Sequence, residues 1–574
     1  MIPVTFHGLL GKLHRPDASR ASGLGVVLVP PHGVEALAAT KSLRILAESL
    51  AERGHAVLRF DLPGTADSLG SDSDPGRLDA WVGAARAAAS FLVAKGGASG
   101  IVMGGLRFGA AIATLAATGC ESFAGLMLLD PVVKGRIYAR ELALTARALA
   151  EGARLDPDAT TTEDGLLIAG LTTTNETLAA IRTVDLGRQA PPEVPTLVLH
   201  RPGAADAMSL ASSWPARPDL AIESIGGFEA ISLSPTMATT PHEVIARAGD
   251  WLDSLPKRTP RPAEPLEPAR LSAPGYTEEA LVFGEADRLF GVLCEPSVPA
   301  EGKPALIIVN AGRNSHVGWA RSGVLLAREL AAQGVASLRM DLAGIGDGRD
   351  RPGAPDTVDA VLYHPANASQ VTAGVDLIAA RGYRELTMLG ACSGAYLALH
   401  HAAADPRIGG LILVNMQRFV WRPGETVEEA IASAYPLAAS YAGKVFEARA
   451  WKRILTGERK VLPLVRAFSR RLGQRVAAIR PSEQTRQARL IMRTLSQRRV
   501  AMDLIFSEND AGLGDLALHF GSGGRWLLRE GIPPITVVPA ADHDMTPPEA
   551  RRTVVERVSA LVGRRGAARG SDAA

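Results

Sequence analysis

The stretch "LTMLGACSGAYLALHHAAA" at residues 386–404 joins an apolar run, typical of a buried strand, to an Ala- and Leu-rich run typical of a helix. A glycine lies two residues before Cys392 and another two residues after it, where small residues let a strand and a helix approach at a sharp turn. Such a turn exposes its central side chain as a nucleophile, so Cys392 is the first candidate for that role. Ser393, with an alanine two residues before it and another two residues after it, is the second candidate, and an inert packed cysteine is the third interpretation.

The chain contains an internal duplication. Residues 8–16, "GLLGKLHRP", align with residues 288–296, "RLFGVLCEP", and the same offset of 280 relates "LRFDLPGTADS" to "LRMDLAGIGDG". After a slip of five residues, "MGGLRFGAAIATLAA" pairs with the stretch around Cys392. Short β-branched runs alternate with helical segments in each copy, which predicts a mostly parallel sheet flanked by helices. In the second copy we expect strands near residues 289–294, 305–310, 335–341, 385–390, 410–415, 501–506 and 534–539.

The length of 574 residues is too great for one compact core and indicates two domains. We expect a first domain at residues 1–255 and a second at residues 278–565. Residues 256–277 are rich in proline, which favours extended backbone, and they are expected to form a linker. Residues 566–574 are small and polar, so a disordered tail is expected there.

Composition excludes several classes of protein. A formal net charge of +2 and a hydrophobic content of 47% fit a globular protein without a nucleic-acid partner. No apolar run is long enough for membrane insertion and no signal sequence is recognisable, so a cytoplasmic location is expected. The three cysteines, Cys120, Cys294 and Cys392, are widely spaced, which predicts a reduced compartment with neither disulfides nor a metal site. The sequence leaves the oligomeric state open, a homo-oligomer included.

The second copy resembles the α/β-hydrolase superfamily, and the resemblance extends over nearly all of both halves. It implies two tandem α/β-hydrolase domains and a triad in the order nucleophile, acid, base, with the acid after a late strand and the base after the last strand. Asp510 in "VAMDLIFSENDAG" and His543 in "PPITVVPAADHDMTPPEARR" occupy those places. Glu508 and Asp515 are the alternatives for the acid. Of the remaining histidines in this copy, two fall on the predicted helix after the turn and three in predicted loops: His400 and His401, and His316, His364 and His519.

These residue types suit acyl chemistry. An ordinary thiol is only a few per cent thiolate at neutral pH, so an imidazole that accepts its proton supplies the nucleophile. His543 would take that proton, and Asp510 would orient the ring. The backbone N–H of Ser393 and a second N–H from Gly312 or Arg313 would form an oxyanion hole.

Three functions are compatible with this set. The first is hydrolysis of an acyl ester or thioester through a Cys-His-Asp triad without a cofactor. The second is an acyltransferase, because a thioester intermediate can pass its acyl group to a carbohydrate, an amine or a carrier-bound acceptor. The third is a non-catalytic binding or scaffold protein, which the complete set of three residue types in one copy argues against. The dienelactone-hydrolase branch of the superfamily also has a cysteine in this turn, which supports catalysis without naming the reaction.

The first copy lacks a nucleophile. Its turn reads Gly105-Leu106-Arg107-Phe108-Gly109, and a guanidinium is always protonated and cannot attack an acyl carbon. Gly203 lies near the acid position with Asp206 just beyond it, and Glu229 lies near the base position. We therefore expect a degenerate first domain, a pseudoenzyme. Arg107 would either bind a carboxylate or phosphate bidentately or serve only the architecture.

An insertion at about residues 416–500 separates two strands of the second copy and is expected to form a helical cap. Its second half is strongly basic with interspersed apolar residues. It is either a solvated amphipathic cap or an entrance that attracts an anionic small-molecule or carrier-bound acyl substrate, with binding to a membrane surface as a lesser option.

A second and weaker resemblance rests on three segments. "LDPVVKGRIYARELAL", "GLLIAGLTTTNETLAAIRTVDL" and "VNMQRFVWRPGETVEEAI" look like segments of the α/β-hydrolase-like proteins associated with bacterial exopolysaccharide and exosortase systems. That resemblance implies acyl chemistry on a carbohydrate or on a carrier-bound precursor.

Overall fold

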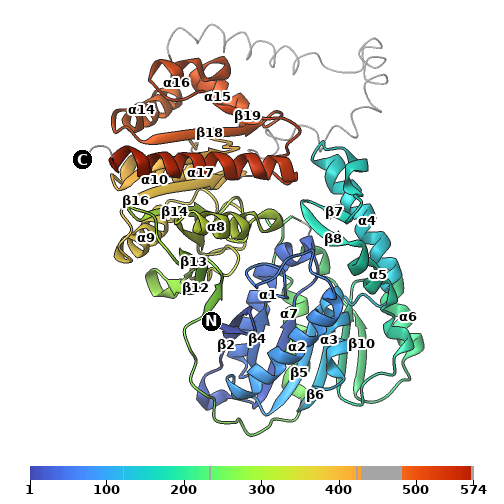
Figure 1. Ribbon diagram of the computed structural model, residues 1–574. Coiled ribbons are helices and arrows are strands. Elements are labelled where there is room, and N and C mark those ends of the chain that lie inside the picture. Colours follow the sequence, from blue (N-terminus) through green and yellow to red (C-terminus); the bar gives the residue numbers. More distant parts are fainter. Residues whose placement is uncertain (121, 232–233, 422–424, 428–480, 571–574) are drawn as a thin grey trace, which may run out of the picture.

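The computed structural model describes residues 1–120, 122–231, 234–421, 425–427 and 481–570 (Figure 1). Two large mixed sheets, each flanked by helices, confirm the prediction of two α/β domains. Most of the predicted cap, residues 428–480, lies outside the described part of the chain. Among the described residues, no helix is both long and apolar enough to cross a bilayer.

The first sheet has eight described strands, in which the β1–β2 and β2–β4 pairs are antiparallel and the other pairs are parallel. In spatial order the strands are β1 (Ile2–Phe6), β2 (Leu9–His14), β4 (Ala56–Phe60), β3 (Leu24–Val29), β5 (Gly100–Leu106), β6 (Phe123–Leu129), β9 (Thr196–His200) and β10 (Leu220–Ser224). The helices are α1 (Val34–Glu52), α2 (Arg77–Ala94), α3 (Phe108–Ala117), α4 (Gly135–Gly152), α5 (Asn175–Thr183), α6 (Ala205–Ser213) and α7 (His242–Ser254). A separate hairpin comprises β7 (Gly165–Ile168) and β8 (Leu171–Thr174).

The second sheet repeats this order with one extra edge strand. Its strands are β11 (Arg270–Ala273), β12 (Tyr276–Phe283), β13 (Leu289–Pro296), β15 (Ala336–Asp341), β14 (Pro304–Val309), β16 (Glu385–Ala391), β17 (Ile408–Val414), β18 (Ala501–Ser507) and β19 (Thr536–Val538). The helices are α8 (Ser322–Ala332), α9 (Asn367–Ala380), α10 (Ser393–Ala404), α14 (Glu483–Gln497), α15 (Gly512–Phe520), α16 (Arg525–Arg529) and α17 (Pro548–Gly570). All seven strands predicted for this copy are present. His519 lies in α15, so its prediction as a loop residue was wrong.

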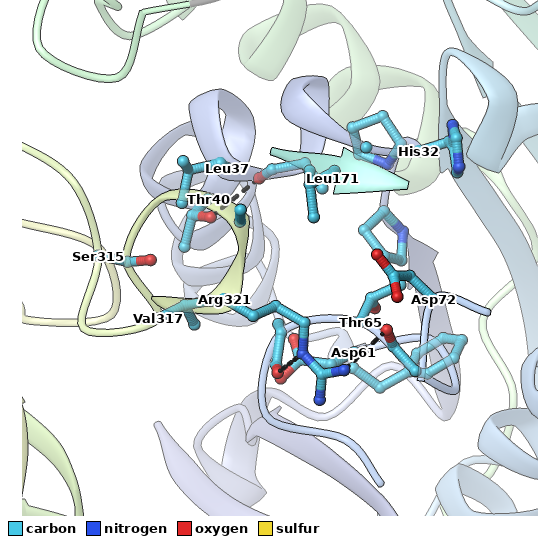
Figure 2. Close-up of a pocket in the computed structure, with 18 of the residues that line it drawn as sticks. His32, Leu37, Thr40, Asp61, Thr65, Asp72, Leu171, Ser315, Val317 and Arg321 are labelled. Carbon is cyan, nitrogen blue, oxygen red and sulfur yellow. Dashed lines mark hydrogen bonds between the residues drawn. The ribbon is translucent and has the colours of Figure 1, made fainter. Parts of the chain in front are cut away.

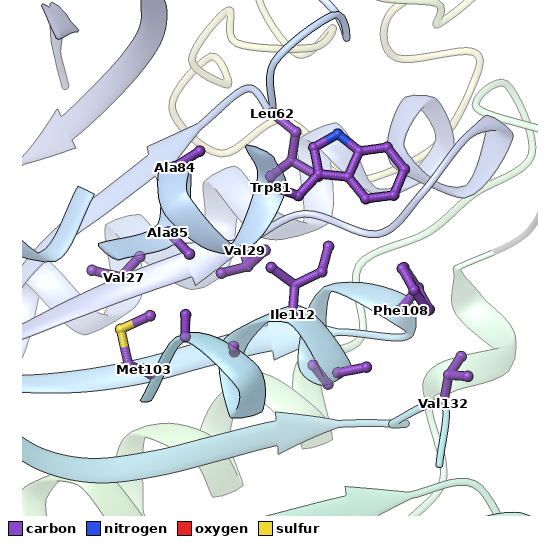
Figure 3. Close-up of a cluster of buried hydrophobic side chains, with 14 of the residues drawn as sticks. Val27, Val29, Leu62, Trp81, Ala84, Ala85, Met103, Phe108, Ile112 and Val132 are labelled. Carbon is purple, nitrogen blue, oxygen red and sulfur yellow. The ribbon is translucent and has the colours of Figure 1, made fainter. Parts of the chain in front are cut away.

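Both faces of each sheet are buried, as the near-continuous apolar strands require. In the first domain, Val27 and Val29 of β3 pack against α2 and α3, where Figure 3 shows Trp81 and Phe108 among the cluster. Val26 and Leu28, which alternate with them along the strand, pack on the opposite face against α1 and α7. The alternation of side chains along a strand thus divides one apolar run between two cores.

The Pro-rich segment between the copies runs along the first domain. Backbone N–H groups of Arg258, Arg261 and Glu264 donate to carbonyls of the first domain. The chain then enters β11, which begins inside the predicted linker and pairs with β12 at the edge of the second sheet.

The two domains meet through paired ionic contacts that the offset of 280 relates to each other. Arg59 of the first domain contacts Asp347 of the second at 2.7 Å, and Arg339 of the second contacts Asp67 of the first at 2.5 Å. These four side chains are nearly inaccessible to solvent. The contact therefore has the reciprocal form of a two-fold interface, in which each copy offers the same surface to the other.

One further residue of the second domain joins this interface. Arg321 donates to four backbone carbonyls of the first-domain loop at residues 64–70, and Figure 2 shows it reaching into a cavity between the domains. That cavity has a volume of about 120 Å³ and is lined by both domains.

His316 lies between two buried carboxylates at this interface. Its Nε2 is 2.7 Å from Asp67 of the first domain, and its Nδ1 is 2.8 Å from Asp341 of its own domain. Burial alone would lower the pKa of His316, but the two carboxylates raise it to about 10. The imidazolium therefore links the domains as a charged group at neutral pH.

We predict that this link weakens in alkali. An unfolded histidine titrates near 6.5, so the stabilisation from His316 is fully present below about pH 6.5 and is lost as the pH rises through about 10. In urea titrations, the loss of unfolding free energy caused by His316→Gln should be largest near pH 6 and should shrink toward pH 10. His242→Gln, at an exposed position on α7, is the matched control. An unchanging difference across that pH range would contradict the charged link.

Candidate active site

Cys392 lies between β16 and α10 with φ 52° and ψ −120°, a conformation that a residue with a Cβ rarely adopts. The flanking glycines permit this turn. A Cβ on Gly390 would lie 2.2 Å from the carbonyl oxygen of Gly394, and a Cβ on Gly394 would lie 2.2 Å from that of Asn310. The strained position therefore belongs to Cys392, while Ser393 is the first residue of α10 and is buried.

The first domain keeps the same turn without the nucleophile. Arg107 has φ 54° and ψ −121°, and a Cβ on Gly105 would lie 2.3 Å from the carbonyl oxygen of Gly109. The two turns are thus alike in backbone and differ in the side chain that they present.

His543 and Asp510 are in direct contact, with 2.6 Å between His543 Nδ1 and Asp510 Oδ2. Asp510 follows β18 and is buried, and His543 follows β19 and is half-buried. When the proton on Nδ1 is donated to the carboxylate, Nε2 is the ring nitrogen that carries the acceptor lone pair. His543 and Cys392 line the same cavity, which has a volume of about 250 Å³.

Asp510 is held by further hydrogen bonds. The backbone N–H of Gly512 donates to its Oδ1 at 2.7 Å, and the amide of Gln417 donates to the same oxygen at 2.8 Å. Gln417 Nε2 is also 3.3 Å from His543 Nδ1. Gln417 could not be recognised from the sequence, because nothing in "VNMQRF" shows that the chain after β17 returns to Asp510.

Asn415 braces the loop that carries His543. Its side-chain amide donates to the backbone carbonyl of His543 at 2.8 Å, and its Oδ1 accepts the N–H of Ser507 at 2.7 Å. One side chain therefore ties the end of β17 to the end of β18 and to the loop after β19.

The alternative acids and bases are engaged elsewhere. Glu508 accepts the N–H of Ala540, and Asp515 accepts the N–H of Phe419. The other histidines have partners away from the Asp510 contact: His316 with Asp67 and Asp341, His364 with Arg351, His400 with the carbonyl of Phe419, His401 with Asp405, and His519 with Thr485.

The expected oxyanion donors already contact hydroxyl groups. The N–H of Gly312 donates to Ser393 Oγ at 3.0 Å, and the N–H of Arg313 donates to Thr236 Oγ1 at 3.4 Å. A hydroxyl that accepts a hydrogen bond keeps its own proton for donation. The Ser393 hydroxyl can therefore accept the hydrogen bond of the Gly312 N–H and donate its own hydrogen bond into the cavity that both residues line.

Asp544 adds a titratable group beside His543. Its side chain lines the Cys392 cavity and also a neighbouring cavity of about 450 Å³ between α8 and α17. Burial raises the pKa of Asp544 to about 6. Its charge therefore changes close to neutral pH, next to the candidate base.

Arg107 of the first domain is paired with carboxylates of its own domain. It contacts Glu35 at 2.8 Å, Glu141 at 2.5 Å and Asp130 at 3.5 Å. Glu35 also accepts the hydroxyl of Tyr138 at 3.0 Å. A bound anion would have to compete with three carboxylates for this guanidinium.

The acid and base positions of the first domain serve its structure. Asp206 accepts the backbone N–H groups of Val133 and Lys134. Glu229 is exposed and accepts the N–H of Gly227. Gly203 has no side chain to offer.

No protein-family model and no curated protein matches this sequence. Among solved structures, Est1E from Butyrivibrio proteoclasticus with bound ferulic acid is 16% identical, with 44% of this chain and 98% of that chain covered and a TM-score of 0.31. A proline iminopeptidase from Mycobacterium smegmatis is 17% identical, with 44% and 96% covered and a TM-score of 0.31. A dienelactone hydrolase from Anabaena variabilis is 14% identical, with 50% and 97% covered and a TM-score of 0.29. Each match spans about one domain of this chain. The assignment of two α/β domains rests on the sheets of this chain itself.

We predict that Gln417→Leu lowers kcat/KM for an activated ester by about 10- to 100-fold, because a hydrogen bond to a charged group contributes about 1.5–3 kcal/mol. The loss should fall mainly on kcat, since Gln417 contacts Asp510 and lies close to His543, and it would act through them. Gln333→Leu, at an exposed position on the same domain, should leave both constants unchanged. A rise in KM alone would contradict a positioning role for Gln417.

A second prediction concerns Asp544. Ionised Asp544 favours protonation of the neighbouring His543, and an imidazole that is to act as a base must be neutral. Asp544→Asn removes the negative charge, so the acidic limb of the kcat/KM profile should move to lower pH. An unchanged limb between pH 5 and 7 would show that Asp544 does not influence the base.

Proposed function

We propose that the protein hydrolyses an acyl ester or thioester of a small molecule through Cys392, His543 and Asp510 in its second domain. The observation that supports this most strongly is the 2.6 Å contact of His543 with Asp510 beside a cavity that Cys392 also lines. The left-handed backbone at Cys392, with glycine on both sides, supports this thiol over the Ser393 hydroxyl as the nucleophile.

The proposed chemistry proceeds in two halves. His543 Nε2 takes the thiol proton as sulfur attacks the acyl carbon, and the same proton then passes to the departing alcohol or thiol. The result is a thioester on Cys392. A water molecule that gives a proton to His543 attacks this thioester, the carboxylic acid is released, and the imidazolium returns the proton to the departing thiolate to restore the thiol. Asp510 keeps the ring oriented and stabilises the imidazolium in both halves.

The negative oxygen of the tetrahedral intermediate needs donors near the turn. The backbone N–H of Ser393 at the start of α10 is the first donor in the proposal. The second is the Gly312 N–H, either directly or through the Ser393 hydroxyl that it contacts. Such donors are commonly worth several kcal/mol in the transition state.

The first domain is proposed to be non-catalytic. A guanidinium at the nucleophile position, enclosed by three carboxylates, offers neither a nucleophile nor an open anion site. Transfer to an acceptor other than water uses the same thioester, so the fate of that intermediate separates the hydrolase from the acyltransferase.

We expect a brief reaction with p-nitrophenyl acetate to give a single acetyl adduct on Cys392, measured as a mass increase of the intact protein. Cys392→Ala should abolish the adduct and turnover while the circular dichroism spectrum stays unchanged. His543→Ala should slow formation of the adduct by about 100-fold or more, because the general base is lost.

Cys294→Ala is the matched control, since burial raises the pKa of that thiol to about 12 and it should not react in the folded protein. Decay of the adduct in buffer alone indicates hydrolysis. Decay that depends on an added alcohol or amine indicates transfer. Full adduct formation in Cys392→Ala would overturn the assignment.

A further inference from the structure

The cavity beside Cys392 is not built by the second domain alone. Ser234, Thr236 and Met237 belong to the first domain, in the loop between β10 and α7, and they line this cavity together with Cys392 and His543. Residues from both copies of the duplication therefore surround one candidate nucleophile.

Direct contacts hold this loop against the expected oxyanion loop. Thr236 Oγ1 accepts the N–H of Arg313, and the Arg313 guanidinium donates to the carbonyl of Ala238 at 3.0 Å. A Cβ on Gly312 would lie 2.7 Å from Thr236 Oγ1, so at this position the glycine leaves room for the loop to approach.

A shared carboxylate fixes the end of the loop. Asp356 of the second domain accepts the backbone N–H of Thr240 at 2.9 Å and its hydroxyl at 2.5 Å. The same carboxylate contacts Lys41 of the first domain and Arg313 of the second, each at 2.8 Å. The loop is thus anchored on both sides of Met237.

The position of this loop in its own domain is informative. In the second domain the loop after the last strand, β19, carries His543. In the first domain the loop after the last strand, β10, carries no histidine before Thr240 and instead extends over the neighbouring site. The loop after β10, which corresponds to the loop that carries His543 in the second domain, thus lines the cavity of the other domain.

The lining of the cavity defines what it accepts. Apart from the loop and the triad, its walls are mainly apolar and aromatic, with Trp319, Leu362, Tyr363 and Val427 among them. None of the described residues that line it is lysine or arginine. The described lining therefore offers no cationic side chain to an anionic group next to Cys392, whereas Asp544 adds a carboxyl to it.

We propose that the first domain forms part of the active site, and that its loop at residues 234–240 is the wall that selects the acyl group. Met237, which is half exposed and lines the cavity, limits the size of the acyl group. That the bound group is an acyl group rests on the proposed function. That residues 234–240 form a wall of the cavity rests only on the contacts of this loop.

The first test compares esters of different acyl size. Met237→Trp should lower kcat/KM for p-nitrophenyl octanoate at least tenfold relative to p-nitrophenyl acetate, and Met237→Ala should shift the preference the other way. Met208→Trp, at an exposed methionine on α6 of the same domain, should not change the preference. If neither variant at Met237 changes the acetate-to-octanoate ratio, the proposal is wrong.

The second test does not require turnover. In a Cys120→Ala background, the alkylation rate of Cys392 is measured by mass with iodoacetamide and with a bulky N-aryl maleimide. Met237→Ala should raise the maleimide rate relative to the iodoacetamide rate, and Met237→Trp should lower it. If the rate ratio changes in this way but no ester is turned over, the role of the loop at residues 234–240 as a wall is supported and the proposed hydrolase function is refuted. If the maleimide-to-iodoacetamide ratio is equal in all variants, the proposal that this loop forms the wall is refuted.

Discussion

The buried ionic contact between the domains is the constraint on which the rest of the molecule depends. Asp67 of the first domain meets both Arg339 and His316 of the second, and none of these side chains can reach water. Charges removed from water must be paired, so the loss of any one of these side chains would leave a buried charge uncompensated. His316 lies in the loop after β14, which also contains Gly312. Its backbone N–H donates to Asp341 at the end of β15. The interface and the candidate active site are therefore parts of one hydrogen-bonded structure.

Much of the fold could be predicted from the sequence, because the same pattern of apolar runs appears in both copies of the duplication. The strands of the second copy were found from β-branched runs that recur at a fixed offset. The strands β11 and β12 were missed, since "RLSA" is short and β12 carries two adjacent glutamates. One of these, Glu278, is buried and contacts Arg339 and Arg328, so a charged residue in this strand is compensated by two arginines of its own domain that lie far away in the sequence. Such long-range compensation leaves no local signal.

Some residues of the candidate site could be recognised from their place in the sequence, and others only from the three-dimensional structure. Cys392, Asp510 and His543 could be named because each follows a strand at a position that the fold prescribes, and the structure brings Asp510 into contact with His543. Gln417 and Thr236 could not be named, because their roles depend on how loops from different strands, or from different domains, converge. The same limit applies to His316, whose sequence neighbourhood resembles any exposed loop. For Arg107, the enclosure by three carboxylates became visible only when β5, α1 and α4 were placed together.

The reciprocal pairing of Arg59 with Asp347 and of Arg339 with Asp67 has a consequence for how the protein behaves on dilution. A site shared between two separate subunits disassembles when the protein concentration falls below the dissociation constant of the dimer. Here both halves are on one chain, so the tether sets their effective concentration and the shared site stays assembled at any dilution. The two halves are also free to differ, because a change in one is not copied into the other. A covalent pair of unlike halves can thus devote one nucleophile position to an arginine that braces its own domain, while a loop of that domain shapes the site of its neighbour.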